Sequence, residues 1–191
     1  MTVLEALLGV AVLLWPLSEI VLSLVRRSRG VRGARALDQG SGTLIWVAIA
    51  AGITLAVVCS GVPATRLRLP AALRLVAALL LLLAGLGLRI WAIVTLGRFF
   101  TVDVALHEGQ RVVREGPYRW VRHPSYAGAL IAFVGAGLAM DNALSLLFAV
   151  VPFLLAVLRR IAVEERALVQ GLGEEYAAYA RVTKRLVPGL Y

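Results

Sequence analysis

Long apolar runs separated by short arginine-bearing segments constrain this sequence more than any other feature. The three longest extend from about Val3 to Val25, Thr43 to Val62 and Ala71 to Leu96. A helix crosses the hydrocarbon of a bilayer with about 20 apolar residues. Of the 191 residues, 60% are hydrophobic and 16% are charged, whereas about a quarter of a soluble domain is charged. The sequence therefore predicts an integral membrane protein.

Two shorter apolar segments follow, from Tyr126 to Met140 and from Ala143 to Leu158, joined by Asp141 and Asn142. A helix of about 15 residues is roughly 23 Å long, which is shorter than the usual span of about 20 residues. We expect a tight membrane hairpin here, and a partly re-entrant hairpin is the alternative. The predicted fold class is an all-α integral membrane protein with about five transmembrane helices, the last two forming this hairpin.

Arginines flank the apolar runs and account for a net charge of +9. They gather in residues 26–42, in residues 97–125 and in the C-terminal tail. With five spans these segments lie on one side, which the excess of arginine marks as cytoplasmic. We therefore expect the N-terminus outside and a cytoplasmic C-terminal helix. Placed in this way, the arginines orient the protein, and we expect no nucleic acid as a partner. The single cysteine, Cys59, offers no zinc spacing, and no metal is expected.

The stretch GPYRWVRHPSYAG, residues 116–128, is polar and conformationally restricted, yet it leads directly into an apolar segment. Pro124 disfavours a helical conformation at His123 and suits the first position of a helix. The sequence therefore predicts a helix that begins at Pro124. Its first amides, with Arg119 and Arg122 beside them, would favour an anion. A helix start with interfacial anchoring side chains is the alternative.

Glu164 and Glu165 follow the second segment of the hairpin. Because a hairpin returns the chain to the side it left, we expect both carboxylates to lie near His123. There they could accept hydrogen bonds from ribose hydroxyls or an ammonium group, or they could simply neutralise nearby arginines. A spacing of three and four residues then predicts one helical face. This face comprises Glu165, Leu168, Leu172, Tyr176 and Tyr179.

One further carboxylate, Glu19, lies inside the first apolar run. An intramembrane carboxylate is a candidate functional group. The alternative, which we favour at this point, is an interfacial position paired with an arginine such as Arg26.

These elements together resemble the isoprenylcysteine carboxyl methyltransferase family and its relatives, the phospholipid N-methyltransferases. The resemblance covers about residues 85–191. It rests on Arg-His-Pro-x-Tyr-x-Gly at 122–128, Glu-Glu at 164–165 and Gly-x-Glu-Tyr-x-x-Tyr at 173–179. It implies a membrane enzyme that takes S-adenosylmethionine from the cytosol. We accordingly expect one membrane domain over residues 1–191, with leading spans in 1–70 and a cofactor-binding catalytic half in 71–191.

The resemblance also implies roles for single residues. His123, Pro124 and Tyr126 would line the cofactor, and Glu164 and Glu165 would hold its ribose or amino acid end. The other cofactor-binding candidates are Tyr176 and Tyr179 of the tail, Gly87 of a Gly-Leu-Gly triplet, and His107. For the triplet, helix packing through small residues is the alternative, and for the second histidine it is a surface position.

Methylation of a carboxylate needs alignment more than acid–base chemistry, because the acceptor is already ionised at neutral pH. A cation must hold the acceptor's carboxylate, and arginine provides a two-pronged donor. We expect Arg89 in this catalytic role first and Arg122 second. Methylation of an amine would instead require a base, for which Glu165 and His123 are candidates.

The sequence thus favours O-methylation of a lipophilic acid, such as a prenylcysteine-like acid, by a protein whose partner is the lipid bilayer. Two other classes stay open. A membrane sterol-type reductase would use a similar C-terminal half and NADPH, with arginines for the 2′-phosphate. A non-enzymatic membrane protein would use the polar stretch as an anchor alone.

Overall fold

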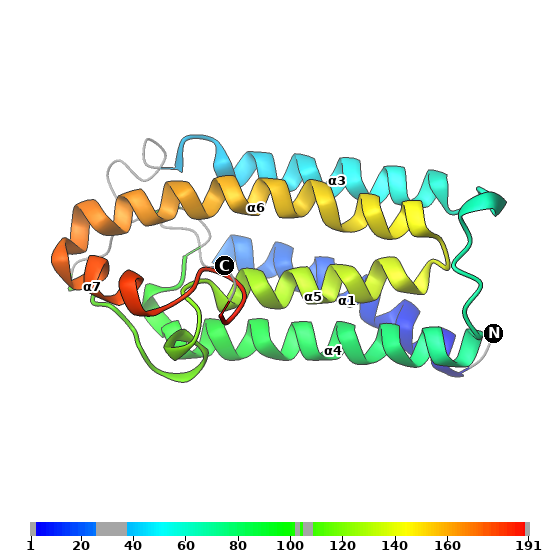
Figure 1. Cartoon of the computed structure of the whole chain (residues 1–191), viewed down its shortest axis with the longest axis horizontal. Coiled ribbons are helices and arrows are strands. Elements are labelled where there is room, and N and C mark those ends of the chain that lie inside the picture. Colours follow the sequence, from blue (N-terminus) through cyan, green and yellow to red (C-terminus); the bar gives the residue numbers. More distant parts are fainter. Residues whose placement is uncertain (1–2, 26–37, 102–103, 105–108, 190–191) are drawn as a thin grey trace.

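The protein is a bundle of long helices (Figure 1). The computed structural model describes residues 3–25, 38–101, 104 and 109–189. The α-helices are α1 (Val3–Val25), α3 (Ser41–Cys59), α4 (Ala71–Leu96), α5 (Pro124–Ala139), α6 (Ala143–Leu172) and α7 (Glu174–Val182). Short 3₁₀ turns are η1 (Pro63–Thr65), η2 (Gly97–Phe99) and η3 (Gly116–Arg119). The described residues contain isolated β-bridges and no strand, so the all-α prediction is confirmed for them.

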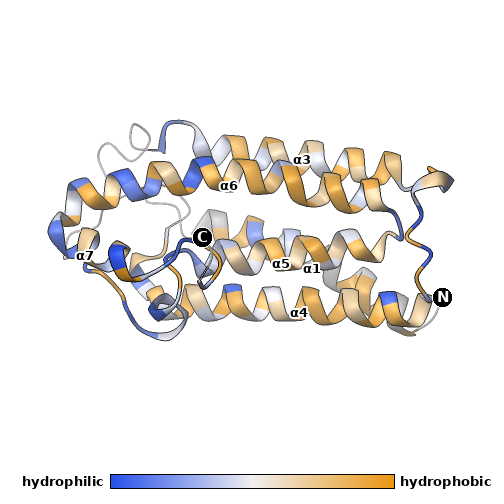
Figure 2. Cartoon of the chain, in the orientation of Figure 1, coloured by the Kyte–Doolittle hydropathy of each residue, from blue (hydrophilic) through white to orange (hydrophobic). Residues whose placement is uncertain are grey.

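The long helices pack in two pairs, which α5 and α6 join. Helix α3 lies along α6, α4 lies along α5, and α1 packs on α4 (Figure 1). Apolar residues cover most of the length of these helices, and hydrophilic residues concentrate toward the ends of the bundle (Figure 2). This distribution is the one expected of helices that cross a bilayer.

Within the part of the chain that the structure describes, three helical segments are long and apolar enough to cross a membrane. They are Ser41–Cys59, Ala71–Phe99 and Ala143–Leu172. Helix α5, with 16 residues, is a shorter apolar helix. The described structure therefore supports an integral membrane protein, and the number of five spans stays a prediction.

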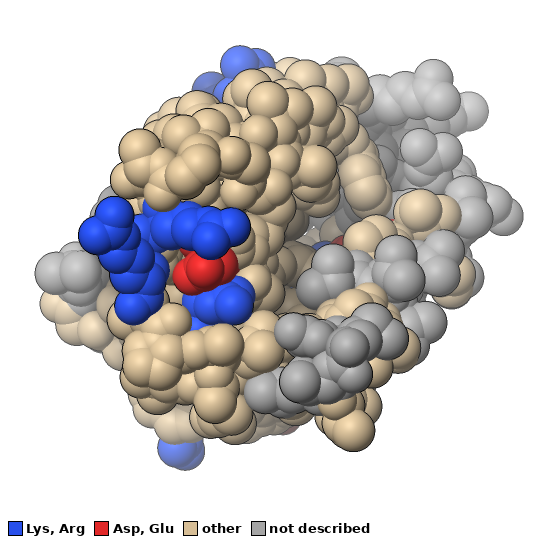
Figure 3. Space-filling model, turned by 90° about the vertical axis from the view of Figure 1, so that its right-hand side faces the viewer, with Lys and Arg blue, Asp and Glu red and all other residues tan. Residues whose placement is uncertain are grey.

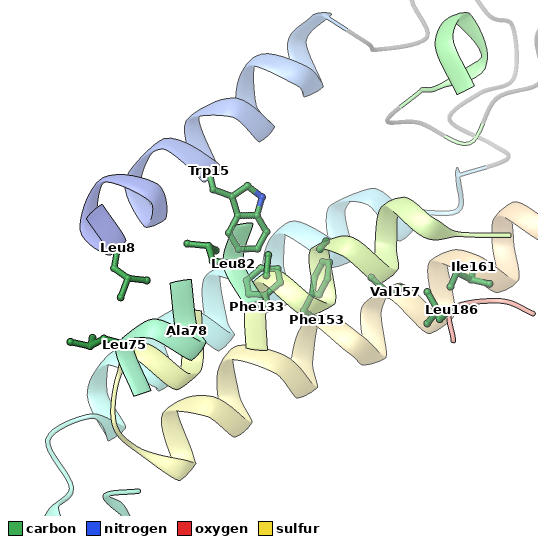
Figure 4. Packing of buried hydrophobic residues seen from close by; sticks show 12 residues of the cluster. Leu8, Trp15, Leu75, Ala78, Leu82, Phe133, Phe153, Val157, Ile161 and Leu186 are labelled. Atoms are coloured by element: carbon green, nitrogen blue, oxygen red, sulfur yellow. The ribbon is translucent and has the colours of Figure 1, made fainter. Parts of the chain in front are cut away.

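A hydrophobic core connects α1 to the α4, α5 and α6 helices. The ring of Phe133 lies 4.6 Å from Trp15 and 4.4 Å from Phe153, measured between centroids. Figure 4 shows this aromatic row, with Leu8 and Leu75 at one end of the cluster. Aromatic pairs of this kind add about 0.5–1.5 kcal/mol beyond the apolar area they bury.

Helices α4 and α5 approach each other through glycine. A Cβ atom on Gly85 would lie 2.5 Å from the Gly128 carbonyl oxygen and 2.5 Å from the Ala132 nitrogen. Only a residue without a side chain permits this backbone contact, which is how small residues drive helix association in membranes. The contact places the start of α5 beside the C-terminal half of α4.

Helix α6 is longer than the apolar segment from which it was predicted. Its 30 residues correspond to about 45 Å, against a hydrocarbon thickness of about 30 Å. The helix continues without interruption through Glu164 and Glu165 to Leu172. Gly173, with φ of 57°, then turns the chain into α7. The last turns of α6 therefore extend beyond the length needed to span a bilayer.

At the opposite end of the bundle, the α5–α6 connection is fixed to the α3–α4 connection. Asn142 caps α6, since its Oδ1 accepts from the Ser145 amide at 3.1 Å, and its Nδ2 donates to the Val62 carbonyl at 3.1 Å. Arg74 lies 3.3 Å from Asp141. Figure 3 views the molecule from this end, where basic side chains surround an acidic one.

Candidate active site

The start of α5 agrees with the sequence prediction. Pro124 is the first residue of the helix, and His123, with φ of −125° and ψ of 56°, is its N-cap. Upstream, Gly116 has φ of 53° and opens the η3 turn, where a Cβ would lie 2.9 Å from Thr95 Oγ1. The backbone amide of His123 donates to the Arg185 carbonyl at 3.0 Å. The segment after α7 therefore holds the polar stretch in place.

His123 lies between the two carboxylates, as predicted. Its Nδ1 is 3.5 Å from Glu164 Oε2, and its Nε2 is 3.3 Å from Glu165 Oε1. Burial opposes a charge on the imidazole, but the hydrogen bonds and negative charges of Glu164 and Glu165 outweigh it and raise the pKa of His123. Some forty residues separate these groups in sequence, and the α5–α6 hairpin brings them together.

Glu164 binds Tyr126 and also Arg160, one of the nearby arginines that the sequence suggested it could neutralise. Its Oε1 accepts from the Tyr126 hydroxyl at 2.5 Å and from Arg160 Nε at 2.9 Å. Arg160 is only 1% exposed, and it also binds Asp38 and, at 3.0 Å, Ser41 Oγ. The spacing of four residues between Arg160 and Glu164 places both on one helical face, which permits the neutralisation that the sequence suggested.

Glu165 binds different partners. Its Oε1 accepts from Arg122 Nε at 2.7 Å, and its Oε2 accepts from Arg185 Nε at 2.9 Å. Arg122 also donates from Nη1 to the Ala180 carbonyl at 3.0 Å and to the Thr183 carbonyl. Glu165 thus ties α6 to the end of α7 and to the segment beyond it.

A cavity of about 660 Å³ begins at this cluster and continues into the bundle. Its polar end is lined by Arg122, His123, Tyr126, Glu164, Tyr176 and Tyr179. Its apolar end is lined by Ile45, Ile49, Ile53, Leu75, Phe133 and Phe153. Ligand pockets in proteins have volumes of about 300–1,000 Å³, and this one joins a charged end to a hydrocarbon-like end.

Two tyrosines of α7 close the polar end. The Tyr179 hydroxyl donates to the Tyr118 carbonyl at 2.6 Å. The Tyr176 hydroxyl is buried and has no hydrogen-bond partner among the described residues, although the side chain lines the cavity. Burial raises the pKa of Tyr176, and it raises the pKa of Tyr179 to about 12. Both hydroxyls therefore stay protonated at neutral pH and can donate.

Arg89 lies on the cavity wall between the two ends, and it pairs with Glu19 of α1. Arg89 Nε and Nη2 donate to the two carboxylate oxygens of Glu19 at 2.5 and 2.6 Å. Its Nη1 donates to Ser125 Oγ at 2.7 Å. Glu19 therefore pairs with an arginine of α4, and Arg26, the partner that the sequence suggested, lies outside the described residues.

Some candidates lie elsewhere. Gly87 is exposed, with open space around the position of a Cβ, and it does not line the cavity. Two residues along a helix turn by about 200°, so the packing of Gly85 against α5 turns Gly87 away from it. Pro124 and Glu165 are near the cavity but are not among the described residues that line it. His107 lies outside the described residues.

Comparison with known proteins points to one family. Residues 77–170 match the model of the isoprenylcysteine carboxyl methyltransferase (ICMT) family. Protein-S-isoprenylcysteine O-methyltransferase B of Arabidopsis thaliana is 39% identical over 113 residues, which cover 58% of this chain and 57% of the relative. The Saccharomyces cerevisiae protein-S-isoprenylcysteine O-methyltransferase is 33% identical over 102 residues, which cover 52% and 43% of the two chains.

A solved structure shares the fold. The eukaryotic intramembrane Ras methyltransferase ICMT superposes with a TM-score of 0.60 at 25% identity, over 76% of this chain and 52% of that one. The present chain thus spans about half the length of the relatives it matches. The resemblance predicted from the polar stretch and the Glu-Glu pair is confirmed, since residues 77–170 match the model of the isoprenylcysteine carboxyl methyltransferase family.

Proposed function

We propose that the protein is an integral membrane methyltransferase that uses S-adenosylmethionine to methylate the carboxylate of a lipophilic acid, such as a prenylated cysteine. One observation carries the proposal. A single cavity joins the His123–Glu164 cluster to an apolar interior, with Arg89 on the wall between them. A polar cofactor could bind at one end of such a cavity and a lipophilic acceptor at the other, so that the two would meet at the bilayer boundary.

The residues at the polar end fit an adenosyl amino acid. Glu164 Oε1 is engaged by Tyr126 and Arg160, whereas among the described contacts its Oε2 has only the 3.5 Å approach of His123. That oxygen could accept from ribose hydroxyls or from an ammonium group. The Tyr176 hydroxyl, which has no partner within the described ranges, is a donor that a ligand would satisfy, since buried polar groups are rarely left unpaired.

When bound, S-adenosylmethionine supplies an electrophilic methyl group on a sulfonium. The protein's own task is alignment and exclusion of water. An acceptor carboxylate is ionised at neutral pH, so no side chain has to remove a proton. Arg89 would hold this carboxylate with two parallel donors, as guanidinium groups do. Arg122 is the second candidate, but its Nε and Nη1 already bind Glu165 and two carbonyls.

We further propose five spans, with the N-terminus outside and α7 in the cytoplasm. The segments rich in arginine then share the cytoplasmic side with the cavity's polar end. The length of α6 supports this placement, because its last turns extend past the bilayer and would carry Glu164 and Glu165 into reach of a cytosolic cofactor.

The decisive experiment measures ligand-induced thermal stabilisation of the detergent-purified protein. We expect S-adenosylhomocysteine to stabilise the wild type, by about 2.7 kcal/mol at 100 times its dissociation constant, and NADPH to have no effect. Glu164→Gln should lose most of the shift. Glu174→Gln, which removes the same charge from an exposed pair with Arg181, should keep it. A shift with NADPH alone would favour the reductase class.

Transfer of labelled methyl from S-adenosylmethionine then identifies the acceptor class. We expect N-acetyl-S-farnesylcysteine to be methylated and its methyl ester to be inert, since only the acid has a free carboxylate. Transfer to phosphatidylethanolamine, with none to the acid, would assign the protein to N-methylation.

A further inference from the structure

We propose that Glu19 is an internal substitute for the acceptor's carboxylate. In the acceptor-free enzyme it holds Arg89, and an acidic lipid must displace it to bind. The inference rests on the proposed function, and it adds a residue of α1, outside the segment that matches the family, as a determinant of acceptor affinity.

The geometry of Arg89 shows which chemical group its donors select. Nε and Nη2 face the two oxygens of one carboxylate at 2.5 and 2.6 Å, which is a two-pronged pair. Nη1 is held separately by Ser125, at 2.7 Å from its Oγ and 3.3 Å from its carbonyl oxygen. Ser125 therefore orients the guanidinium through Nη1. The remaining donors, Nε and Nη2, are the ones that Glu19 binds.

The Arg89–Glu19 pair lies where the carboxylate of an acceptor would bind. Arg89 and Glu19 both line the cavity, and their side chains are 13% and 22% exposed. Ser125 is two residues from His123, so the pair lies next to the polar cluster. Beyond it the cavity continues between apolar side chains. A lipid whose chain fills the apolar end would bring its carboxylate to Arg89.

Helix α1 forms one wall of this cavity. Leu8, Gly9, Trp15, Pro16 and Glu19 all line it. Trp15 Nε1 donates to Glu19 Oε1 at 3.1 Å, one turn away on the same helix. Figure 4 shows Trp15 directed from α1 toward Phe133. Glu19 therefore lies on a helix that borders the part of the cavity where the acceptor would bind. If Glu19 moved away from Arg89, the Nε and Nη2 donors would be available to the incoming acid.

Competition between two carboxylates has a distinctive signature. An acid must displace Glu19, so its affinity is lowered by the cost of breaking the resident pair. The matching methyl ester carries no charge and gains nothing from Arg89. Neutralising Glu19 should therefore tighten the acid and leave the ester unchanged. If Glu19 merely positioned Arg89, its loss would weaken the acid instead.

The test measures dissociation constants of N-acetyl-S-farnesylcysteine and its methyl ester in detergent, with S-adenosylhomocysteine present. For Glu19→Gln we expect the acid to bind roughly five- to tenfold more tightly, a coupling of ordinary size, and the ester to bind as in the wild type. The double variant Glu19→Gln with Arg89→Gln should lose this gain. Glu174→Gln, the matched change in an exposed ion pair of α7, should alter neither constant.

An unchanged or lower ratio of acid to ester affinity in Glu19→Gln would overturn the inference, as would a gain that survives in the double variant. If Glu19→Gln does not fold, Glu19→Asp withdraws the carboxylate by one methylene and should show a smaller gain in the same direction. Failure of the proposed function looks different. In that case the wild type would neither bind S-adenosylhomocysteine nor methylate the acid, whatever the binding ratio.

Discussion

Glu164 and Glu165 are adjacent in sequence, yet they belong to two different regions of the molecule. Glu164 lines the cavity and connects Tyr126 to the deeply buried Arg160. Glu165 faces the chain after α7 and joins Arg122 to Arg185. His123 lies between them and contacts both. One carboxylate therefore lies on the cavity wall, and the other fastens the segment after α7 to α6.

The largest effect should come from the buried arginine behind Glu164. Arg160→Met would leave Glu164 and Asp38 without their cation, and removing one partner of a buried pair typically costs about 3–5 kcal/mol. Chemical unfolding in detergent measures this loss. The neighbouring Arg159 is exposed and donates to the Gln39 carbonyl at 3.3 Å. Arg159→Met should change stability by less than about 0.5 kcal/mol, and equal losses in both would contradict the assignment.

Next in size is the paired change of the two carboxylates. Glu164→Gln should weaken S-adenosylhomocysteine by roughly 10- to 100-fold, because a hydrogen bond to a charged group contributes about 1.5–3 kcal/mol. Glu165→Gln should instead lower the thermal stability of the ligand-free protein and change affinity less. Calorimetric titration and thermal unfolding of both variants provide the comparison. The reverse pattern would exchange the roles assigned to them.

A smaller effect is expected for the two tyrosines of α7. Tyr176→Phe removes a hydroxyl that has no partner among the described residues, so the ligand-free protein should be as stable or slightly more stable, while ligand affinity falls about five- to tenfold. Tyr179→Phe removes the 2.6 Å bond to the Tyr118 carbonyl and should cost about 1 kcal/mol of stability without ligand. Loss of stability in Tyr176→Phe would show that its hydroxyl has a structural role.

The smallest expected effect is the pH dependence of stability that His123 introduces through its contacts with Glu164 and Glu165. The carboxylates raise the pKa of His123 above its ordinary value of about 6.5. Its contribution to stability is therefore complete below about pH 6.5 and is lost as the pH rises through the higher folded value. Melting temperatures from pH 6 to pH 9 should decline more in the wild type than in His123→Gln. Parallel profiles would exclude this contribution.

The sequence predicted those parts of the structure that depend on local rules. Helix α1 spans Val3–Val25 and α4 spans Ala71–Leu96, as the apolar runs indicated. Helix α5 begins at Pro124 because proline suits the first position of a helix. The approach of His123 to Glu164 and Glu165 followed from the hairpin alone. A turn that reverses the chain brings residues that are distant in sequence close together, whatever the side-chain packing of the two helices.

Features that depend on the rotation of one helix against another were not predicted. Glu165 was expected both at the cofactor and as a candidate base, although of the two carboxylates Glu164 is the one that lines the cavity. Gly87 was expected at the cofactor, whereas Gly85 is the glycine that packs on α5. The partner of Glu19 is an arginine 70 positions away, and the burial of Arg160 was not predicted, because an arginine at the end of an apolar segment is ordinarily an interfacial anchor.

The pairing of residues 184–185 with the polar stretch affects the order in which the protein is assembled. The amides of Arg122 and His123 donate to the carbonyls of Lys184 and Arg185 at 2.7 and 3.0 Å. During synthesis, residues 184–185 leave the ribosome some sixty residues after Arg122 and His123. Until then the polar stretch lacks these hydrogen bonds, so a nascent chain that stalls between the two segments would lack the support that holds His123 beside Glu164 and Glu165.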